Sequence, residues 1–119
     1  HAMGESGSPI IFKTVKGGPG SWQGLMLAGG SNTLNYLQLT GGGKSNFQSI
    51  ESALYLDKTA DLATSNTSIS SSSGYGVYYF RKQGGCSSAK LSDYIYGAGI
   101  TKCKFFCIEE TSGAGTCLK

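Results

Sequence analysis

The chain of 119 residues is long enough for one domain with a modest hydrophobic core. With 39% hydrophobic residues, 14% charged residues, 19 glycines and 2 prolines, it has the composition of a folded chain rich in turns. The net charge of +3 is spread thinly and is densest at Lys102 and Lys104, so the sequence lacks the clustered basic residues of a nucleic-acid-binding surface. It also lacks the run of about 20 apolar residues that spans a bilayer. We therefore expect no nucleic acid as a partner and no transmembrane segment.

The first residues, "HAMGES", resemble the remnant of an expression tag, and we assign residues 1–7 to a tail outside the fold. The single histidine of the chain, His1, lies in this tail. We therefore expect no histidine in a catalytic or metal site. Any signal peptide or lipid-anchor cysteine would precede this segment.

After the tail, the chain is predicted to form short strands. Helical periodicity is nearly absent, except for a turn expected around residues 47–50, whereas apolar runs of strand length recur and are bounded by Gly, Ser, Asn or Asp. In chain order, these runs span residues 9–15, 22–27, 34–40, 53–58, 62–69 and 75–80.

Two interleaved series of these runs recur along the chain. In the first series Leu25, Leu54 and Val77 correspond, at intervals of 29 and 23 residues. In the second series Leu39 and Ile69 correspond, at an interval of 30 residues. This pattern arises when a chain coils and lays one strand of each type on the strand of the previous turn, so that inward side chains stack in columns. The sequence therefore predicts a solenoid of parallel sheets with two strands per coil.

A serine tract at residues 68–73 separates a strand of the second series from the next strand of the first series. We interpret the serine tract as a corner of the coil, because small residues fit beneath the turn above without a clash. The longer segment "TGGGKSNFQSIES" is expected to form the preceding corner. A flexible linker is the alternative interpretation of so serine-rich a run.

Four phrases in the first two thirds of the chain resemble those of a known family. They are a "PI.F" strand, a "G.W.G" phrase within Pro19 to Gly24, an "LNY..L" strand and an "S..S.GYG" corner, and together they cover about residues 8 to 80. In these phrases the chain resembles right-handed parallel β-helix proteins of the pectate-lyase-like superfold, as found in bacterial surface proteins and lipoproteins.

The resemblance implies an all-β chain that forms a right-handed parallel β-helix, a single-stranded solenoid of few coils. We expect the coils to span residues 8–85. The resemblance says little about activity, because this fold carries polysaccharide lyases, hydrolases, adhesins and pure scaffolds.

Residues 86–119 depart from the repeat, and we expect them to form an irregular last coil and a cap that covers the exposed sheet edges. The opposite end has no evident cap. Preceding sequence or another copy of the chain could cover it, so an end-to-end homo-oligomer is a candidate assembly.

All four cysteines lie in this last segment, and they are Cys86, Cys103, Cys107 and Cys117. We expect two disulfides, and the spacing leaves all three connectivities open. Disulfides indicate an oxidising location, which is extracellular, periplasmic or on the outer cell surface. A zinc site of four cysteines and four free buried thiols are the alternatives.

Charged residues are mostly scattered along the chain. The closest approach to a cluster is Asp57 with Lys58 and Asp61, where one strand gives way to the next. Arg81 follows the matching strand one coil later, so Asp57 and Arg81 are expected to lie near each other as an ordinary surface pair.

The sequence offers no recognisable catalytic set. Glu109 and Glu110 are adjacent, so on a strand they would point to opposite faces and could not act together in glycoside hydrolysis. A nucleophile has no histidine to activate it, and "GGGKS" lacks the first glycine of a phosphate-binding loop. We predict no catalytic residue, no metal site and no cofactor.

Aromatic rings give the chain a means of binding sugars. Seven tyrosines and Trp22 offer flat faces that could stack on a sugar ring. Tyr79 aligns with Leu27 and Leu56 and is expected to face inward, which directs its two neighbours outward. The candidate binding residues are Tyr78, Phe80, Asp57 and Arg81.

These observations predict a non-enzymatic module for binding or adhesion, secreted or exposed on a cell surface, with a polysaccharide or another cell-surface ligand as its partner. A reduced or truncated carbohydrate-active enzyme and a structural fragment of a longer solenoid are the alternatives. A binding module predicts an exposed aromatic or polar strip along one sheet. An enzyme predicts at least three charged residues that converge on one outer groove.

Overall fold

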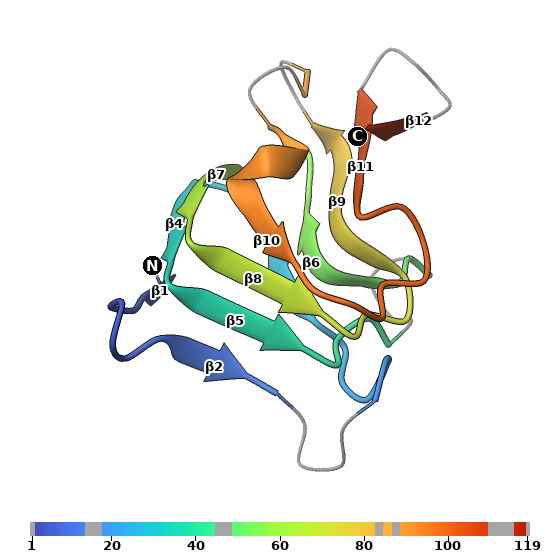
Figure 1. Ribbon diagram of the computed structural model, residues 1–119. Coiled ribbons are helices and arrows are strands. Elements are labelled where there is room, and N and C mark those ends of the chain that lie inside the picture. Colours follow the sequence, from blue (N-terminus) through green and yellow to red (C-terminus); the bar gives the residue numbers. More distant parts are fainter. Residues whose placement is uncertain are drawn as a thin grey trace.

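The computed structural model of the chain describes residues 2–13, 18–44, 49–82, 85–86, 89–109 and 116–118. These residues form strands and one short 3-10 turn, η1 (Leu91–Asp93), with no α-helix among them. The strands wind in successive coils that lie one above another (Figure 1). The chain is an all-β parallel solenoid of about three coils, as the sequence predicts.

Each of the three full coils contributes one strand to each of three sheets. Sheet 1 holds, in order, β1 (Ala2–Met3), β4 (Ser31–Asn35) and β7 (Asp61–Ser65). Sheet 2 holds β2 (Ile10–Phe12), β5 (Leu37–Thr40), β8 (Thr67–Ser70) and β10 (Tyr94–Tyr96). Sheet 3 holds β3 (Leu25–Leu27), β6 (Ser52–Leu56), β9 (Tyr75–Lys82), β11 (Phe105–Glu109) and β12 (Thr116–Leu118). All pairs between these strands are parallel except that of β12 with β11.

The predicted apolar column in sheet 3 is confirmed. Leu54 of β6 pairs with Leu25 of β3 on one side and with Val77 of β9 on the other. Phe105 of β11 continues the column beyond Val77. Leu54, Val77 and Phe105 have no solvent exposure, so this column lies at the centre of the hydrophobic core.

Each coil has three strands, so the prediction of two strands per coil is wrong. The run at residues 34–40 contains β4 and β5, which are divided at Tyr36 with a φ of 49°. One coil later, Asn66 with a φ of 50° divides β7 from β8 in the same way. A single left-handed residue turns the chain from sheet 1 into sheet 2, while Leu39 and Ile69 still pair as the sequence predicts.

The interpretation of the serine tract as a corner is confirmed. The tract ends β8, and the chain turns at Ser71, which has a φ of 53°. The hydroxyl of the buried Ser72 donates a hydrogen bond to the Tyr75 carbonyl at 2.8 Å. The hydroxyl of Ser73 donates to the Gly43 carbonyl of the previous coil at 2.6 Å. Serine suits this corner because its short side chain satisfies backbone carbonyls both within a coil and between coils.

The preceding corner is longer, and residues 47 and 48 of the turn expected around residues 47–50 lie outside the described residues. At the other end of the chain, Ala2 and Met3, which the sequence pattern assigns to a tail, form β1 and pair in parallel with β4.

A partial fourth coil covers two of the three sheets. β10 adds to β8 in sheet 2, and β11 adds to β9 in sheet 3. The segment before β10 carries η1 and adds no strand to sheet 1, so β7 is the last strand of that sheet in the described part of the chain. The other edge of β11 is paired with β12.

A disulfide joins Cys86, in the segment before β10, to Cys107 on β11, with the two Cα atoms 6.3 Å apart. Cys103 is disulfide-bonded as well. The Cys86–Cys107 bond rules out the two connectivities in which Cys86 pairs elsewhere. It also rules out the alternatives of free thiols and a zinc site that uses these two sulfurs.

The first coil, in contrast, leaves apolar side chains open to solvent. Its strands β1, β2 and β3 are the edge strands of their sheets in the described residues. Met3, Ile11, Phe12 and Met26 are 39% to 55% exposed. The two ends of the solenoid therefore differ, since one carries a partial coil over two of its three sheets, tied by a disulfide and with Ile95 exposed on β10, and the other presents the open apolar strands of the first coil.

We expect the substitution Ser71→Gly to raise the free energy of unfolding by roughly 0.5–1 kcal/mol, because glycine adopts a positive φ without the steric cost that serine bears there. Ser68→Gly in β8 is the matched control and should lower the free energy of unfolding by a similar amount. Urea denaturation of both variants measures the two effects. A Ser71→Gly variant that is less stable than the wild type would contradict this account of the corner.

We expect the double substitution Cys86→Ala and Cys107→Ala to lower the free energy of unfolding by about 2–4 kcal/mol, since the bond closes a loop over a sequence separation of 21. Limited proteolysis should then cleave the chain first within residues 89–104, because the partial coil is no longer tied by the disulfide. Unchanged stability together with unchanged cleavage would show that the bond adds nothing to the fold.

Candidate functional site

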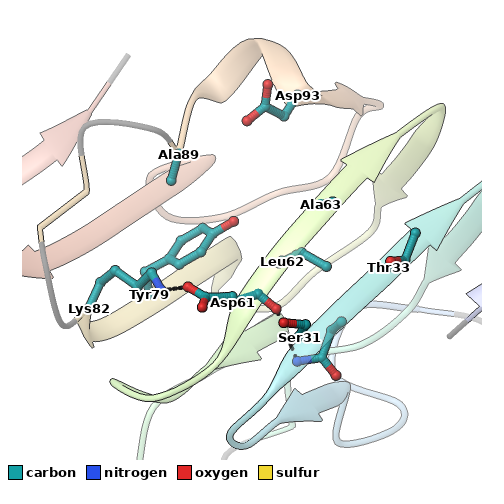
Figure 2. Close-up of a pocket in the computed structure, with 10 residues that line it drawn as sticks. Ser31, Thr33, Asp61, Leu62, Ala63, Tyr79, Lys82, Ala89 and Asp93 are labelled. Atoms are coloured by element: carbon teal, nitrogen blue, oxygen red, sulfur yellow. Dashed lines mark hydrogen bonds and ion pairs between the residues drawn. The ribbon is translucent and has the colours of Figure 1, made fainter.

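A pocket of about 270 Å³ opens where the fourth coil adds no strand to sheet 1. Figure 2 shows it between β4 and β7 on one side and the segment that carries Ala89 and Asp93 on the other. Its apolar lining comes from Leu62, Ala63, Ala89 and the ring of Tyr79. Its polar lining consists of Ser31, Asn32, Thr33, Asp61, Lys82 and Asp93.

Lys82 is the one charged residue that is buried in the described part of the chain. Its ammonium group donates hydrogen bonds to the Ala60 carbonyl at 2.9 Å and to the Asp61 carboxylate, with which it forms an ion pair. The Lys82 side chain is 11% exposed, whereas that of Asp61 is 74% exposed. A buried charge needs such partners, and here they also hold the Asp61 carboxylate at the mouth of the pocket.

A bulge in β9 directs Lys82 inward. Tyr79 pairs with Cys107, but Lys82 pairs with Glu109, so the two residues Phe80 and Arg81 oppose a single residue of β11. The extra residue reverses the alternation of the strand, and Lys82 therefore points to the same side as Tyr79. Simple alternation from Tyr79 would have placed Lys82 outside, which is why the sequence pattern does not reveal it.

Hydrogen bonds fix the polar groups at the rim. The side-chain nitrogen of Asn32 donates to the carbonyls of Gly29, Gly30 and Asp61 at 3.1–3.2 Å, which ties the rim across two coils. The Asp93 carboxylate accepts a hydrogen bond from the backbone N–H of Lys90 at 3.1 Å at the start of η1. The rim is thus held in place by backbone contacts.

The hydroxyl of Tyr79, in the lining of the pocket, stays neutral at physiological pH. The hydroxyls of Tyr79 and Tyr94 are hydrogen-bonded to each other at 2.8 Å inside the core. Burial raises the pKa of Tyr79 to about 12, against the lowering effect of its hydrogen bond with Tyr94. Burial also raises the pKa of Tyr94 well above its ordinary value.

Asp57, a predicted binding residue, lies at the corner after β6 and acts as a structural group there. Its carboxylate accepts hydrogen bonds from the backbone N–H and the hydroxyl of Thr59 at 2.9 and 2.8 Å, and from the backbone N–H of Gly29 at 3.3 Å. Burial acts to raise the pKa of Asp57, but these hydrogen bonds outweigh it and lower the pKa from 3.8.

The predicted neighbour of Asp57, Arg81, has a side chain that lies outside the described residues, so their proximity stays a prediction. The same applies to the side chains of Glu109 and Glu110. The structure does bring Asp61 and Lys82 together as an ion pair in the pocket, and Asp61 belongs to the charged cluster that the sequence suggests.

The two aromatic candidates, Tyr78 and Phe80, lie on the outer face of sheet 3. Tyr78 is only 3% exposed, because its ring stacks between Tyr55, with centroids 5.7 Å apart, and Phe106, at 4.9 Å. The inward orientation predicted for Tyr79 is confirmed, since it lies in the main core. The outer face of sheet 3 carries a second hydrophobic cluster, so Tyr78 does not offer its ring to solvent.

Within the described ranges, no three His, Cys, Asp or Glu side chains gather closely enough to hold a metal ion. No helix in those ranges is long and apolar enough to cross a bilayer. Comparisons with protein-family models, curated proteins and solved structures give no match for this chain. The pocket and its polar rim are therefore the candidate functional site.

We expect Asp57→Ala to lower the free energy of unfolding by about 1 kcal/mol at pH 7, because the hydrogen bonds to Thr59 and Gly29 are lost. Since the pKa of Asp57 is lowered in the folded state, this contribution is present above the ordinary value of 3.8 and is lost as the pH falls through the lowered value.

Urea denaturation from pH 7 to pH 2.5 should therefore show the difference between wild type and Asp57→Ala narrowing in acid. Lys58→Ala, at the exposed neighbouring position, serves as the control and should show no such change. A difference that stays constant over the whole range would mean that the carboxylate does not stabilise the corner.

Proposed function

We propose that this protein is a non-enzymatic, secreted or surface-exposed module that binds carbohydrate, with the pocket beside β7 as its site. The observation that supports the proposal is a pocket lined on one part by polar groups and on another by apolar side chains and the neutral Tyr79 ring. Sugar rings have apolar C–H faces and a border of hydroxyl groups, so they need both kinds of surface at once.

The size and rigidity of the pocket favour a small part of a glycan. Its volume of about 270 Å³ lies just below the range of roughly 300–1,000 Å³ that is usual for small-molecule sites, which suits a single sugar unit at a chain end or branch. The rim residues Asn32, Asp61 and Asp93 are already fixed by hydrogen bonds, so little conformational entropy is lost when a ligand binds.

The disulfide between Cys86 and Cys107 supports an extracellular, periplasmic or outer-surface location, because such bonds persist in oxidising compartments. A right-handed β-helix of the bacterial surface type, including lipoproteins, remains our proposal for the family. The open apolar first coil supports the further proposal of an end-to-end homo-oligomer, or of a longer solenoid of which this chain is a fragment.

A reduced or truncated carbohydrate-active enzyme is the second candidate. Three charged residues, Asp61, Lys82 and Asp93, line one groove, as this alternative requires. Two carboxylates facing one sugar could divide the roles of acid and base. Against it, two of the three N–H donors of Lys82 are already bonded to Ala60 and Asp61, which is the arrangement of a structural ion pair.

A glycan array with the wild-type protein and the variant Ala63→Trp tests the proposal. Ala63 lines the pocket on exposed β7, so the large indole should fill the pocket and weaken binding at least about tenfold. Ala28→Trp places the same side chain at an exposed position outside the pocket and should bind like the wild type.

Absence of binding to any glycan, or equal binding by Ala63→Trp, would rule out carbohydrate binding at this pocket. Release of new reducing ends from a bound glycan, abolished by Asp61→Asn or Asp93→Asn, would favour the enzyme instead.

A further inference from the structure

We infer that the pocket is selective for uncharged sugars and amino sugars and rejects acidic sugars such as uronates. This inference rests on the proposed function and adds the chemical class of the ligand. It follows from the charges in the pocket and from the hydrogen-bonding groups that remain for a ligand.

The charges in the pocket leave an excess of negative charge. The lining holds the two carboxylates of Asp61 and Asp93 and the single ammonium group of Lys82. Lys82 lies almost wholly inside the protein, and its ammonium group is bonded to the carboxylate of Asp61 and to the carbonyl of Ala60. A ligand therefore meets the exposed carboxylates more directly than it meets the buried ammonium group.

The hydrogen-bonding groups at the rim are mainly acceptors. The amide nitrogen of Asn32 already donates to three carbonyls, so its oxygen is the part that remains for a ligand. One carboxylate oxygen of Asp93 accepts a hydrogen bond from the Lys90 N–H, and one of Asp61 accepts a hydrogen bond from the Lys82 ammonium group. The second oxygen of each carboxylate can therefore accept a hydrogen bond from a ligand. The hydroxyls of the two remaining polar lining residues can donate or accept.

A rim of acceptors matches a ligand with surplus donors. Each sugar hydroxyl supplies one O–H donor, and the ammonium group of an amino sugar supplies three N–H donors with a positive charge. A uronate, in contrast, would bring a third carboxylate beside Asp61 and Asp93 with no exposed basic side chain in the lining to balance it. The pocket therefore distinguishes ligands by charge as well as by shape.

The test measures binding to a glycan array with neutral, amino and acidic sugars, followed by titration calorimetry with three oligosaccharides of equal length made of glucosamine, N-acetylglucosamine and galacturonate. We expect binding among the neutral or amino sugars and at least about tenfold weaker binding of the galacturonate. Binding of glucosamine should weaken as the salt concentration rises.

The variant Asp93→Asn removes one negative charge and keeps an oxygen that can accept the hydrogen bond from Lys90. We expect it to weaken binding of glucosamine about five- to tenfold and to leave N-acetylglucosamine within about twofold. Glu51→Gln removes the same charge outside the pocket, where Glu51 pairs with Lys102, and should leave both affinities unchanged.

Binding of galacturonate that is as tight as that of glucosamine, or tighter, would overturn the inference, while carbohydrate binding itself would stand. An equal effect of Asp93→Asn and Glu51→Gln would also overturn it, because the selectivity would then reflect net charge and not the pocket. Absence of binding to every sugar class would instead overturn the proposed function, and the inference with it.

Discussion

The register between successive coils is the constraint on which the rest of this structure depends. Each coil satisfies its backbone hydrogen bonds on the coil below, and a slip of one residue would turn the whole inward column to solvent. Leu25, Leu54 and Val77 hold this register, although the chain between them differs in length by several residues. Most of the difference lies in the corner before sheet 3, which is long between β5 and β6 and short between β8 and β9.

The same constraint explains where the pocket forms. A coil that adds a strand to every sheet leaves no room beside its neighbour, whereas the fourth coil adds strands to sheets 2 and 3 only. Polar side chains line the pocket at the open edge of β7. The bulge in β9 turns Lys82 inward, where its ammonium group forms an ion pair with Asp61. The pocket and the charged side chains in its lining therefore both lie where the fourth coil departs from the repeat.

The apolar columns could be predicted because inward residues of a strand alternate with period two and repeat from coil to coil. The third strand of each coil could not be predicted from the sequence. Tyr36 divides the run at residues 34–40 by a left-handed conformation, which bulky residues disfavour. Asn66 at the equivalent position was the available hint, because asparagine adopts that conformation more readily.

The site was harder to predict than the fold. Alternation places Tyr78 on the outer face correctly, but it does not say whether other rings cover that face. Asp57 belongs to the cluster of charged residues that the sequence suggests, yet its carboxylate accepts hydrogen bonds from the backbone at and near its own corner. The inward orientation of Lys82 could not be predicted, because a bulge can be recognised only when the partner strand is known.

The difference between the two ends of the solenoid gives the molecule a direction of unfolding. In a stacked array each coil is supported only by its neighbours, so structure is lost stepwise from the less supported end. We therefore expect the first coil, with Met26 and Ile11 open to solvent, to unfold before the coils that the bond between Cys86 and Cys107 ties together. The pocket lies beside the coils tied by the disulfide, so we expect its shape to persist when the first coil unfolds.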